Sequence, residues 1–320
     1  MKYRRIGHSG LLVSELSLGL WHNFGDVDDY TTARQMVRYA YDNGITQFDL
    51  ANNYGPSPGS AERTFGHILK EELEGERNKI VITSKAGYLM WDGPYGEWGS
   101  RKYLVSSCDE SLKRMDIDYV DIFYSHRYDP NTPLEETMGA LDYIVRSGRA
   151  LYAGLSNYPA DKLREAAAIL KSLGTPCLVD QLKYSMIVRE PEEEHFRAHQ
   201  ELGIGCVSFS PLAQGQLTAR YLKDMPEDSR AVRSTGYLQV EEVEQNHARI
   251  VALNQIAKER GEELSQMAIA WQLFDKKCSA QRISSVIIGA SRVSQLEENF
   301  KALSSAPFSD EELALIDAQR

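Results

Sequence analysis

Four ionisable side chains follow consecutive apolar segments of this chain. Residues 48–55 end an apolar strand on Asp49 and place Tyr54 five positions later. The next two apolar segments end on Lys85 and His126. An Asp followed by a loop Tyr is common on its own. Three successive strands that deliver Asp and Tyr, then Lys, then His indicate one constellation.

These residue types suit the protonation of a carbonyl oxygen. A tyrosine hydroxyl has an unperturbed pKa of about 10 and is a poor acid at neutral pH. Because a nearby ammonium favours the phenolate, we expect Lys85 to lower the pKa of Tyr54. Asp49 would hold Lys85 protonated and oriented, and His126 would hydrogen-bond the substrate oxygen.

Two other interpretations of the same residues stay open. Asp49 and Lys85 could form an ordinary buried ion pair at the mouth of a barrel, since interior charges are usually paired. That interpretation leaves Tyr54 and His126 without a role. Alternatively, Lys85 could form a Schiff base with a carbonyl substrate. Asp49 argues against a Schiff base because it keeps Lys85 charged.

Alternating apolar strands and amphipathic helices position these side chains. Eight predicted strands are each followed by a helix, which is the count of a (β/α)8 barrel, or TIM barrel. The C-terminal ends of such strands meet at one face, so we expect a shared pocket there. The predicted strands are 16–20, 47–51, 80–85, 120–125, 150–155, 178–183, 205–210 and 285–288. The predicted helices are 32–42, 60–72, 101–114, 133–146, 161–173, 192–202 and 293–303.

Two segments stand outside this repeat. Residues 3–6 and 11–13 flank a Ser-Gly turn and predict an N-terminal β-hairpin. Residues 211–284, after the seventh strand, contain a polar loop and two predicted helices, 242–260 and 264–274. Because this long insertion begins at the active face of the barrel, we expect it to cover a cofactor. No shift in composition marks a linker, so residues 1–320 are expected to form a single domain.

Composition and charge exclude several classes of function. The 320 residues carry a formal net charge of -10, without a basic run, which argues against a nucleic-acid surface. We find no apolar stretch long enough to cross a membrane and no leader-like N-terminus. Widely spaced cysteines predict free thiols in a reducing compartment, hence a cytoplasmic location. They are Cys108, Cys177, Cys206 and Cys278.

One metal-like spacing is rejected. His195 and His199 stand four positions apart on a predicted helix, a spacing that metal ligands use. Neither a Glu between them nor a third ligand is evident, so we expect a solvated helix face and no metal site.

Over essentially its whole length the chain resembles the aldo-keto reductases, which are (β/α)8 barrels with an Asp, Tyr, Lys and His tetrad. Asp49, Tyr54, Lys85 and His126 match that tetrad residue by residue. The resemblance implies reduction of a small-molecule carbonyl substrate with NADPH, the proton coming from Tyr54. The chain has no Gly-x-Gly-x-x-Gly motif, so the cofactor would be held in the manner of these barrels.

Three further segments resemble cofactor-binding segments of that family. Ser156 and Asn157, with Gln181, match the residues that hydrogen-bond the nicotinamide carboxamide. Residues 209–212 resemble the segment that stacks on the nicotinamide and runs beneath the pyrophosphate, and residues 287–299 resemble the one that holds the adenosine end. The implied cofactor-binding residues are Trp21, Ser156, Asn157, Gln181, Phe209, Ser210, Pro211, Leu212, Gln214, Gly215, Arg220, Arg230, Gly289, Ser291, Arg292, Gln295, Glu298 and Asn299.

The form of the last segment indicates a branch of the family. Gly289 and Ala290 stand where the commonest pattern has Lys-Ser, which is similar to the branch of bacterial L-glyceraldehyde 3-phosphate reductases and potassium-channel beta subunits. Gly289 permits close backbone approach, and the helix start after it offers N–H groups to phosphate. Arg292 could pair with a 2′-phosphate, which favours NADPH over NADH.

The branch leaves two functions open. The channel subunits carry Asn where this chain has His126, so His126 favours an active reductase of glyceraldehyde 3-phosphate or a methylglyoxal-like carbonyl. The alternative is a nucleotide-sensing regulatory subunit that docks on a partner. Relatives in this branch form tetramers and larger assemblies, which implies a homo-oligomer.

Aromatic residues on the loops are candidates for substrate contact. Trp21, Tyr88 and Trp91 could line an aromatic pocket or could pack at the rim of the barrel. Arg127, next to His126, could face a phosphate or carboxylate of the substrate, or could be a solvated loop charge. The sequence assigns no role to Asn52 and Asn53.

Overall fold

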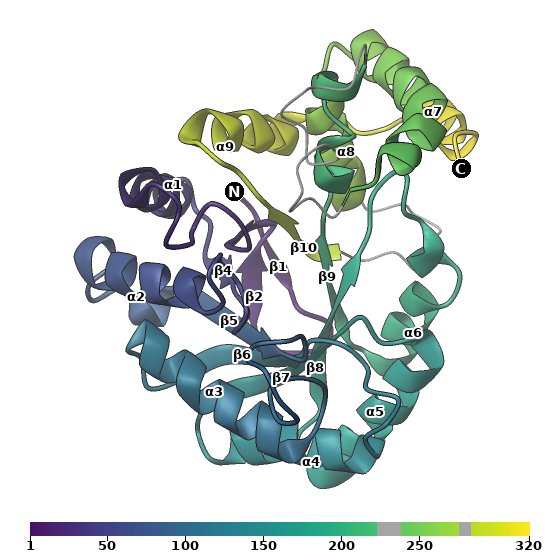
Figure 1. Cartoon of the computed structure of the whole chain (residues 1–320). Coiled ribbons are helices and arrows are strands. Elements are labelled where there is room, and N and C mark those ends of the chain that lie inside the picture. Colours follow the sequence, from purple (N-terminus) through teal and green to yellow (C-terminus); the bar gives the residue numbers. More distant parts are fainter. Residues whose placement is uncertain (223–237, 275–282) are drawn as a thin grey trace.

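The computed structural model describes residues 1–222, 238–274 and 283–320, and it shows a closed barrel of parallel strands (Figure 1). The strands follow one another around the barrel in chain order, and the last pairs with the first. They are β3 (Leu16–Gly19), β4 (Gln47–Asp49), β5 (Val81–Ala86), β6 (Val120–Ser125), β7 (Ala150–Ser156), β8 (Cys177–Lys183), β9 (Gly205–Phe209) and β10 (Ile283–Ile288). The predicted (β/α)8 architecture is confirmed.

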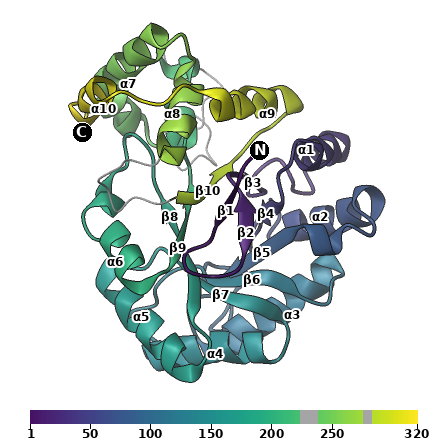
Figure 2. The same cartoon turned by 180° about the vertical axis from the view of Figure 1, so that it is seen from behind.

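Helices surround the barrel, as Figures 1 and 2 show from opposite sides. In α1 the buried residues Ala33, Met36, Val37 and Ala40 recur at helical spacing, so one face packs on the strands. Each predicted element is present, with ends that differ by at most three residues. The helices are α1 (Tyr30–Asp42), α2 (Ser60–Glu72), α3 (Arg101–Met115), α4 (Leu134–Arg146), α5 (Ala160–Leu173), α6 (His195–Leu202), α7 (Val240–Glu259), α8 (Leu264–Leu273) and α9 (Val293–Phe300).

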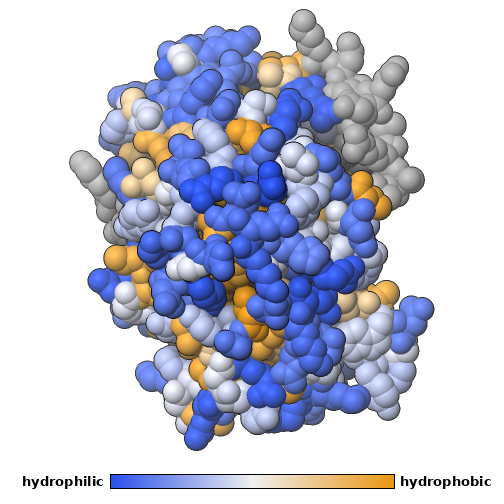
Figure 3. Space-filling view, turned by 90° about the vertical axis from the view of Figure 1, so that its left-hand side faces the viewer, coloured by the Kyte–Doolittle hydropathy of each residue, from blue (hydrophilic) through white to orange (hydrophobic). Residues whose placement is uncertain are grey.

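The outer faces of these helices are polar. Figure 3 shows a side of the molecule on which hydrophilic residues dominate and hydrophobic residues are scattered. Apolar side chains instead fill the layer between helices and barrel, where Phe48, Phe65 and Phe123 are fully buried. No helix in the described part of the chain is both long and apolar enough to cross a membrane.

The N-terminal hairpin is present and covers one end of the barrel. β1 (Tyr3–Arg5) pairs with β2 (Leu12–Ser14) in antiparallel register. Ile6 and Val13 are buried in one cluster with Val81 and Leu178, which lie near the starts of β5 and β8. The hairpin therefore closes the N-terminal end of the barrel, opposite the face where the strands end.

The C-terminal region contains a helix that the sequence analysis did not predict. After α9, a 3-10 turn covers Lys301–Ser304, and α10 (Asp310–Asp317) follows. Ser309 and Glu312 form a capping box at its start. Arg249 of α7 donates to the backbone carbonyl of Gln319 at 2.7 Å, which ties the chain end to α7. Ser309 and Glu312 are the recognisable signal for this helix in the sequence.

The insertion after β9 contains α7 and α8, close to the two predicted helices. Arg230 and Cys278 lie outside the described residues. Cys108, Cys177 and Cys206 are free and buried. Whether the insertion covers a cofactor stays a prediction.

Candidate active site

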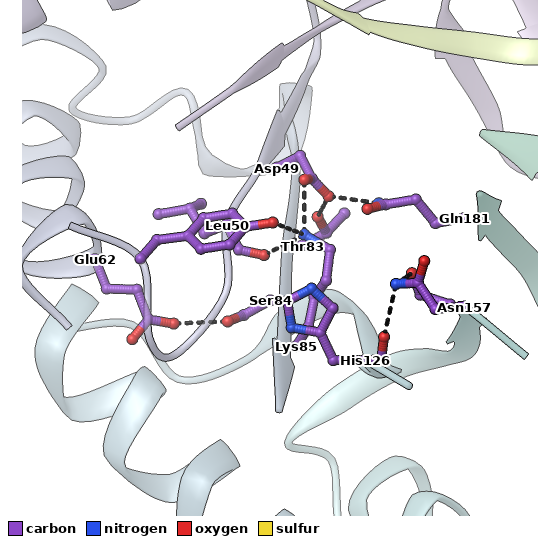
Figure 4. A network of polar contacts seen from close by, with 11 residues as sticks. Asp49, Leu50, Glu62, Thr83, Ser84, Lys85, His126, Asn157 and Gln181 are labelled. Atoms are coloured by element: carbon purple, nitrogen blue, oxygen red, sulfur yellow. Dashed lines mark hydrogen bonds and ion pairs between the residues drawn. The ribbon is translucent and has the colours of Figure 1, made fainter. Parts of the chain in front are cut away.

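The four predicted catalytic residues lie together at the C-terminal end of the barrel. Asp49 is the last residue of β4, Lys85 lies near the end of β5, and His126 directly follows β6. These strands are neighbours in the barrel, and Tyr54 reaches the same place from the loop after β4. Figure 4 shows the resulting polar network.

Lys85 lies at the centre of this network. Its fully buried ammonium group is 2.7 Å from a carboxylate oxygen of Asp49 and donates to the backbone carbonyl of Leu50 at 2.6 Å. The Tyr54 hydroxyl lies 3.4 Å from the same nitrogen. The ammonium therefore joins Asp49 and Tyr54, which do not contact each other directly by any hydrogen bond found in the described residues.

Asp49 is held by more than Lys85. Its second carboxylate oxygen accepts from the Thr83 hydroxyl and from the Gln181 amide, each at 2.8 Å. Thr83 comes from β5 and Gln181 from β8, on the far side of the barrel. Because buried carboxylates need several donors, this bonding fixes the orientation that Asp49 presents to Lys85.

Burial dominates the protonation of the site and overturns one expectation. Burial, together with the Asp49 carboxylate, raises the pKa of Tyr54 well above its usual value. Lys85 was expected to lower that pKa, but its charge does not outweigh the loss of solvent around the phenol. Burial also lowers the pKa of Lys85, and Asp49 opposes that change. Tyr54 therefore remains a neutral phenol at neutral pH, as a proton donor must.

His126 is a neutral imidazole in this environment. Burial, and then the charges of Lys85 and Arg127, lower its pKa well below 6.5. Its Nδ1 is buried and has no hydrogen-bond partner among the described residues. The Tyr54 ring lies 6.0 Å from the His126 ring between centroids. A neutral imidazole beside Tyr54 can hydrogen-bond an uncharged carbonyl oxygen.

A second layer of charges supports the strand that holds Lys85. Glu62 of α2 is fully buried, and it accepts hydrogen bonds from Ser84 and from Arg114, each at 2.6 Å. Its charge adds a small upward contribution to the pKa of Lys85. The sequence analysis assigned Glu62 no site role, because a Glu in a first helical turn is common and its partners are distant in sequence.

Asn52 also has a structural role that the sequence did not indicate. Its backbone N–H donates to the carbonyl of Lys85 at 2.9 Å. Its side-chain amide donates to the Tyr103 hydroxyl at 3.0 Å and to Ser107 at 3.2 Å. Asn52 thereby joins the loop after β4 to α3.

Three of the predicted cofactor residues lie beside the tetrad. Ser156 ends β7, and Asn157 follows it with a left-handed backbone φ of 54°. The Asn157 amide donates to the His126 backbone carbonyl at 3.0 Å, and Gln181 bonds Asp49. The Asn157 amide also donates to the Ser156 hydroxyl at 3.0 Å. The amides of Asn157 and Gln181 thus lie beside the tetrad, where they fit the carboxamide of a nicotinamide ring (Figure 4).

The segment after β9 turns sharply at the rim of the barrel. Ser210 and Gln214 both have left-handed backbone conformations, with φ of 56° and 59°. Of the other predicted residues of this segment, Phe209 ends β9, and Pro211, Leu212 and Gly215 lie in the turn itself. Arg220 is exposed on a 3-10 turn, Ala219–Tyr221.

The segment after β10 is open to solvent. An added Cβ at Gly289 would meet no atom within 4 Å, and Ser291 and Arg292 are exposed. Arg292 provides no side-chain cap to α9, so the helix start leaves backbone N–H groups free for an anion. Gln295 bonds Ser291, Glu298 pairs with Lys301, and Asn299 is buried. Open backbone at a helix start fits the phosphates of a dinucleotide.

The candidate substrate residues occupy different positions. The Trp21 ring lies 6.2 Å from the Tyr54 ring, and the Tyr88 ring lies 4.7 Å from the His126 ring. The Trp91 ring instead packs edge-on against Tyr103 at 5.4 Å. The structure therefore brings Trp21 and Tyr88 to the tetrad and places Trp91 against α3.

The His195 and His199 pair is not on a solvated helix face, so that expectation is wrong. His199 is 6% exposed and its Nε2 lies 2.8 Å from a carboxylate oxygen of Asp180. His195 pairs with the backbone carbonyl of Tyr158 at 2.9 Å. The helix packs closer to β8 than its sequence suggests. Within the described ranges, no cluster of His, Cys, Asp or Glu is arranged to hold a metal ion.

Sequence comparisons find relatives along nearly the whole chain. The sequence model of the Aldo/keto reductase family matches residues 15–320. The chain is 49% identical to an L-glyceraldehyde 3-phosphate reductase of Escherichia coli O157:H7, over 99% of this chain and 92% of the relative. It is 40% identical to a probable voltage-gated potassium channel subunit beta of Arabidopsis thaliana, over 96% of this chain and 92% of the relative. Both matches extend over almost the whole barrel.

Proposed function

The chain belongs to the aldo/keto reductase family, and we propose that it is an NADPH-dependent reductase of small aldehydes and ketones. The observation that supports this proposal most directly is the contact of the buried Lys85 ammonium with both Asp49 and the Tyr54 hydroxyl. An ion pair that only filled the barrel mouth would not require a phenol and a neutral imidazole beside it.

The proposed reaction divides between the cofactor and the protein. When bound, the reduced nicotinamide supplies the hydride that adds to the carbonyl carbon. Tyr54 gives its proton to the carbonyl oxygen, and the Lys85 ammonium stabilises the phenolate that remains. His126 hydrogen-bonds the same oxygen and orients the carbonyl. Asp49 keeps Lys85 charged against the effect of burial.

The cofactor would be held by residues of β7 to β10 and the loops that follow. Ser156, Asn157 and Gln181 would bond the carboxamide, and the free start of α9 would receive phosphate. Arg292 is exposed and unpaired with any carboxylate in the described residues. It would contact the 2′-phosphate that distinguishes NADPH from NADH.

L-glyceraldehyde 3-phosphate is the substrate we propose first, because a relative that is 49% identical is named a reductase of this compound. The test is an activity assay on a panel of aldehydes and ketones, with NADPH and with NADH. Turnover is measured as the loss of absorbance of the reduced cofactor. We expect turnover of glyceraldehyde 3-phosphate or methylglyoxal with NADPH. A panel without any turnover would contradict the proposal.

The second candidate is a nucleotide-sensing regulatory subunit, which the relatives named potassium channel subunits support. His126 disfavours it, because channel subunits that resemble this chain carry Asn there. Recovery of a membrane partner in a pull-down, with negligible carbonyl turnover, would favour this candidate over the reductase.

A further inference from the structure

Residues 87–99, between β5 and α3, form a wall beside His126. Gly87 is packed so closely that an added Cβ would lie 2.9 Å from the His126 Cβ. The next residue, Tyr88, places its ring edge-on to the His126 ring at 4.7 Å and 89°. The position of this segment therefore sets the space available to a substrate next to His126.

Arg127 contacts both ends of the 87–99 segment. Its guanidinium carbon lies 4.3 Å from the centre of the Tyr88 ring and 3.6 Å from that of the Trp98 ring. Its Nε donates to the Gly87 carbonyl at 2.9 Å, and the Trp98 backbone N–H donates to the same carbonyl at 3.0 Å. Arg127 also forms an ion pair with Glu97. One side chain thus joins residues near both ends of the segment.

This use of Arg127 depends on the shape of a guanidinium. The group is planar, so its faces can lie against aromatic rings while its edge donates hydrogen bonds. The Arg127 side chain is 19% exposed, and Glu97 already balances its charge. Arg127 is therefore neither a solvated loop charge nor an unpaired cation.

The opposite side of the segment is fixed through Asn52. The Tyr103 hydroxyl accepts from the Asn52 amide and donates to the Tyr88 carbonyl at 2.6 Å. Asn52 is itself bonded to the backbone of Lys85. Tyr88 is therefore held between Arg127 on one side and a chain of hydrogen bonds from the Lys85 strand on the other.

We propose that Arg127 is a positioning residue that fixes the 87–99 segment against His126, and that it does not receive a phosphate or carboxylate of the substrate. The proposal rests on the proposed carbonyl reduction. In this proposal Tyr88 lines the substrate site, and Arg127 and Asn52 determine the position of Tyr88. If the substrate carries an anionic group, side chains other than Arg127 bind it.

The deciding experiment compares Arg127→Met with the wild type on glyceraldehyde and on glyceraldehyde 3-phosphate. If Arg127 positions the 87–99 segment, kcat/KM falls by a similar factor for both substrates. We expect a factor of about ten, which corresponds to the loss of one desolvated cation–π contact. If Arg127 binds the phosphate, the loss is about a hundredfold and confined to the phosphorylated substrate, and the proposal is overturned.

Matched variants separate shape from charge. Trp98→Leu removes one ring from the guanidinium and should reproduce the loss for both substrates. Arg127→Lys keeps the charge without the planar group, so it should recover little activity, whereas a phosphate-binding role predicts substantial recovery. The control is Lys102→Met, which removes an exposed cation 5.1 Å from the Tyr95 ring of the same segment and should change neither substrate's kcat/KM.

Amide hydrogen exchange provides a readout that needs no turnover. Exchange in residues 87–99 should accelerate in Arg127→Met and in Trp98→Leu, and stay at the wild-type rate in Lys102→Met. Unchanged exchange in the first two variants overturns the positioning role. A wild type that reduces no carbonyl contradicts the proposed function instead, and leaves this comparison of exchange rates intact.

Discussion

The two halves of the barrel mouth differ in how far their polar groups are already satisfied. On β4 and β5, Asp49 and Lys85 are buried and bonded to each other and to neighbouring donors and acceptors. On the segment after β10, Gly289, Ser291 and Arg292 are exposed. The first half is organised by the protein alone, and the second has the form of a surface that a ligand completes.

The proposed function gives each half a different task. A proton donor needs a fixed partner before the substrate arrives, because reorganisation during reaction would cost rate. In the proposed function the dinucleotide brings its own charges, so open backbone N–H groups and the exposed Arg292 are sufficient to bind it. Variants of the first half should therefore lower kcat and the free energy of unfolding, whereas variants of the second half should lower the affinity for the cofactor.

The largest expected effect is the loss of the Tyr54 hydroxyl. Tyr54→Phe should lower kcat by about 10²- to 10⁴-fold, since it removes the proposed proton donor. It should leave NADPH affinity unchanged in a fluorescence titration, because the ring stays in place. Tyr30→Phe, which removes a hydroxyl bonded to exposed Glu71 on the helical surface, is the control and should keep full activity. If Tyr54→Phe kept its turnover, the half of the barrel mouth at β4 and β5 would not be the site of proton transfer.

Breaking the buried ion pair should cost stability as well as activity. Lys85→Met leaves the Asp49 carboxylate buried with Thr83 and Gln181 as its remaining donors. We expect a loss of about 3–5 kcal/mol in the free energy of unfolding, measured with urea. The double variant Asp49→Asn with Lys85→Met removes the stranded charge and should regain much of that stability while staying inactive. Equal stability of the single variant and the wild type would show that this half is not organised by the pair.

The buried imidazole predicts a smaller, pH-dependent effect. The folded-state pKa of His126 is lowered well below 6.5, so the unfolded chain takes up a proton first as the pH falls. His126 therefore costs stability below about pH 6.5, at about 1.4 kcal/mol per pH unit until the folded state also protonates. Urea titrations at pH 7.5 and pH 5.5 should show a larger loss for the wild type than for His126→Asn. Equal losses in the two proteins would mean that His126 is not held neutral.

The sequence predicted the residues of the first half because strand order is readable from it. Asp49, Lys85 and His126 end three successive apolar segments, and neighbouring parallel strands bring such ends together. It did not reveal Glu62, whose partners Ser84 and Arg114 are 22 and 52 positions away. Contacts between helices depend on how each helix is rotated, which no local spacing fixes.

Burial also decided where the sequence-based expectations failed. The pKa of Tyr54 was given the wrong direction because Lys85 was visible in the sequence and the loss of solvent was not. His199 was placed on a solvated face for the same reason, although it lies against Asp180. In both cases the residue types were right and their surroundings could not be read from one strand or helix.

The smallest expected effect tests the open half. Arg292 is exposed, and its Nε donates to the Ser294 hydroxyl at 3.1 Å, so its removal should leave the free energy of unfolding unchanged. Arg292→Ala should weaken NADPH binding by about tenfold, the worth of one exposed charge-assisted contact, and leave NADH binding unaltered. Arg146→Ala, a change at another exposed arginine on α4, should alter neither affinity. Fluorescence titrations with both cofactors measure the ratio of the NADPH and NADH dissociation constants in each variant. A parallel loss for NADPH and NADH would mean that Arg292 shapes the start of α9 rather than reading the 2′-phosphate, and the second half would then be organised by the protein as the first is.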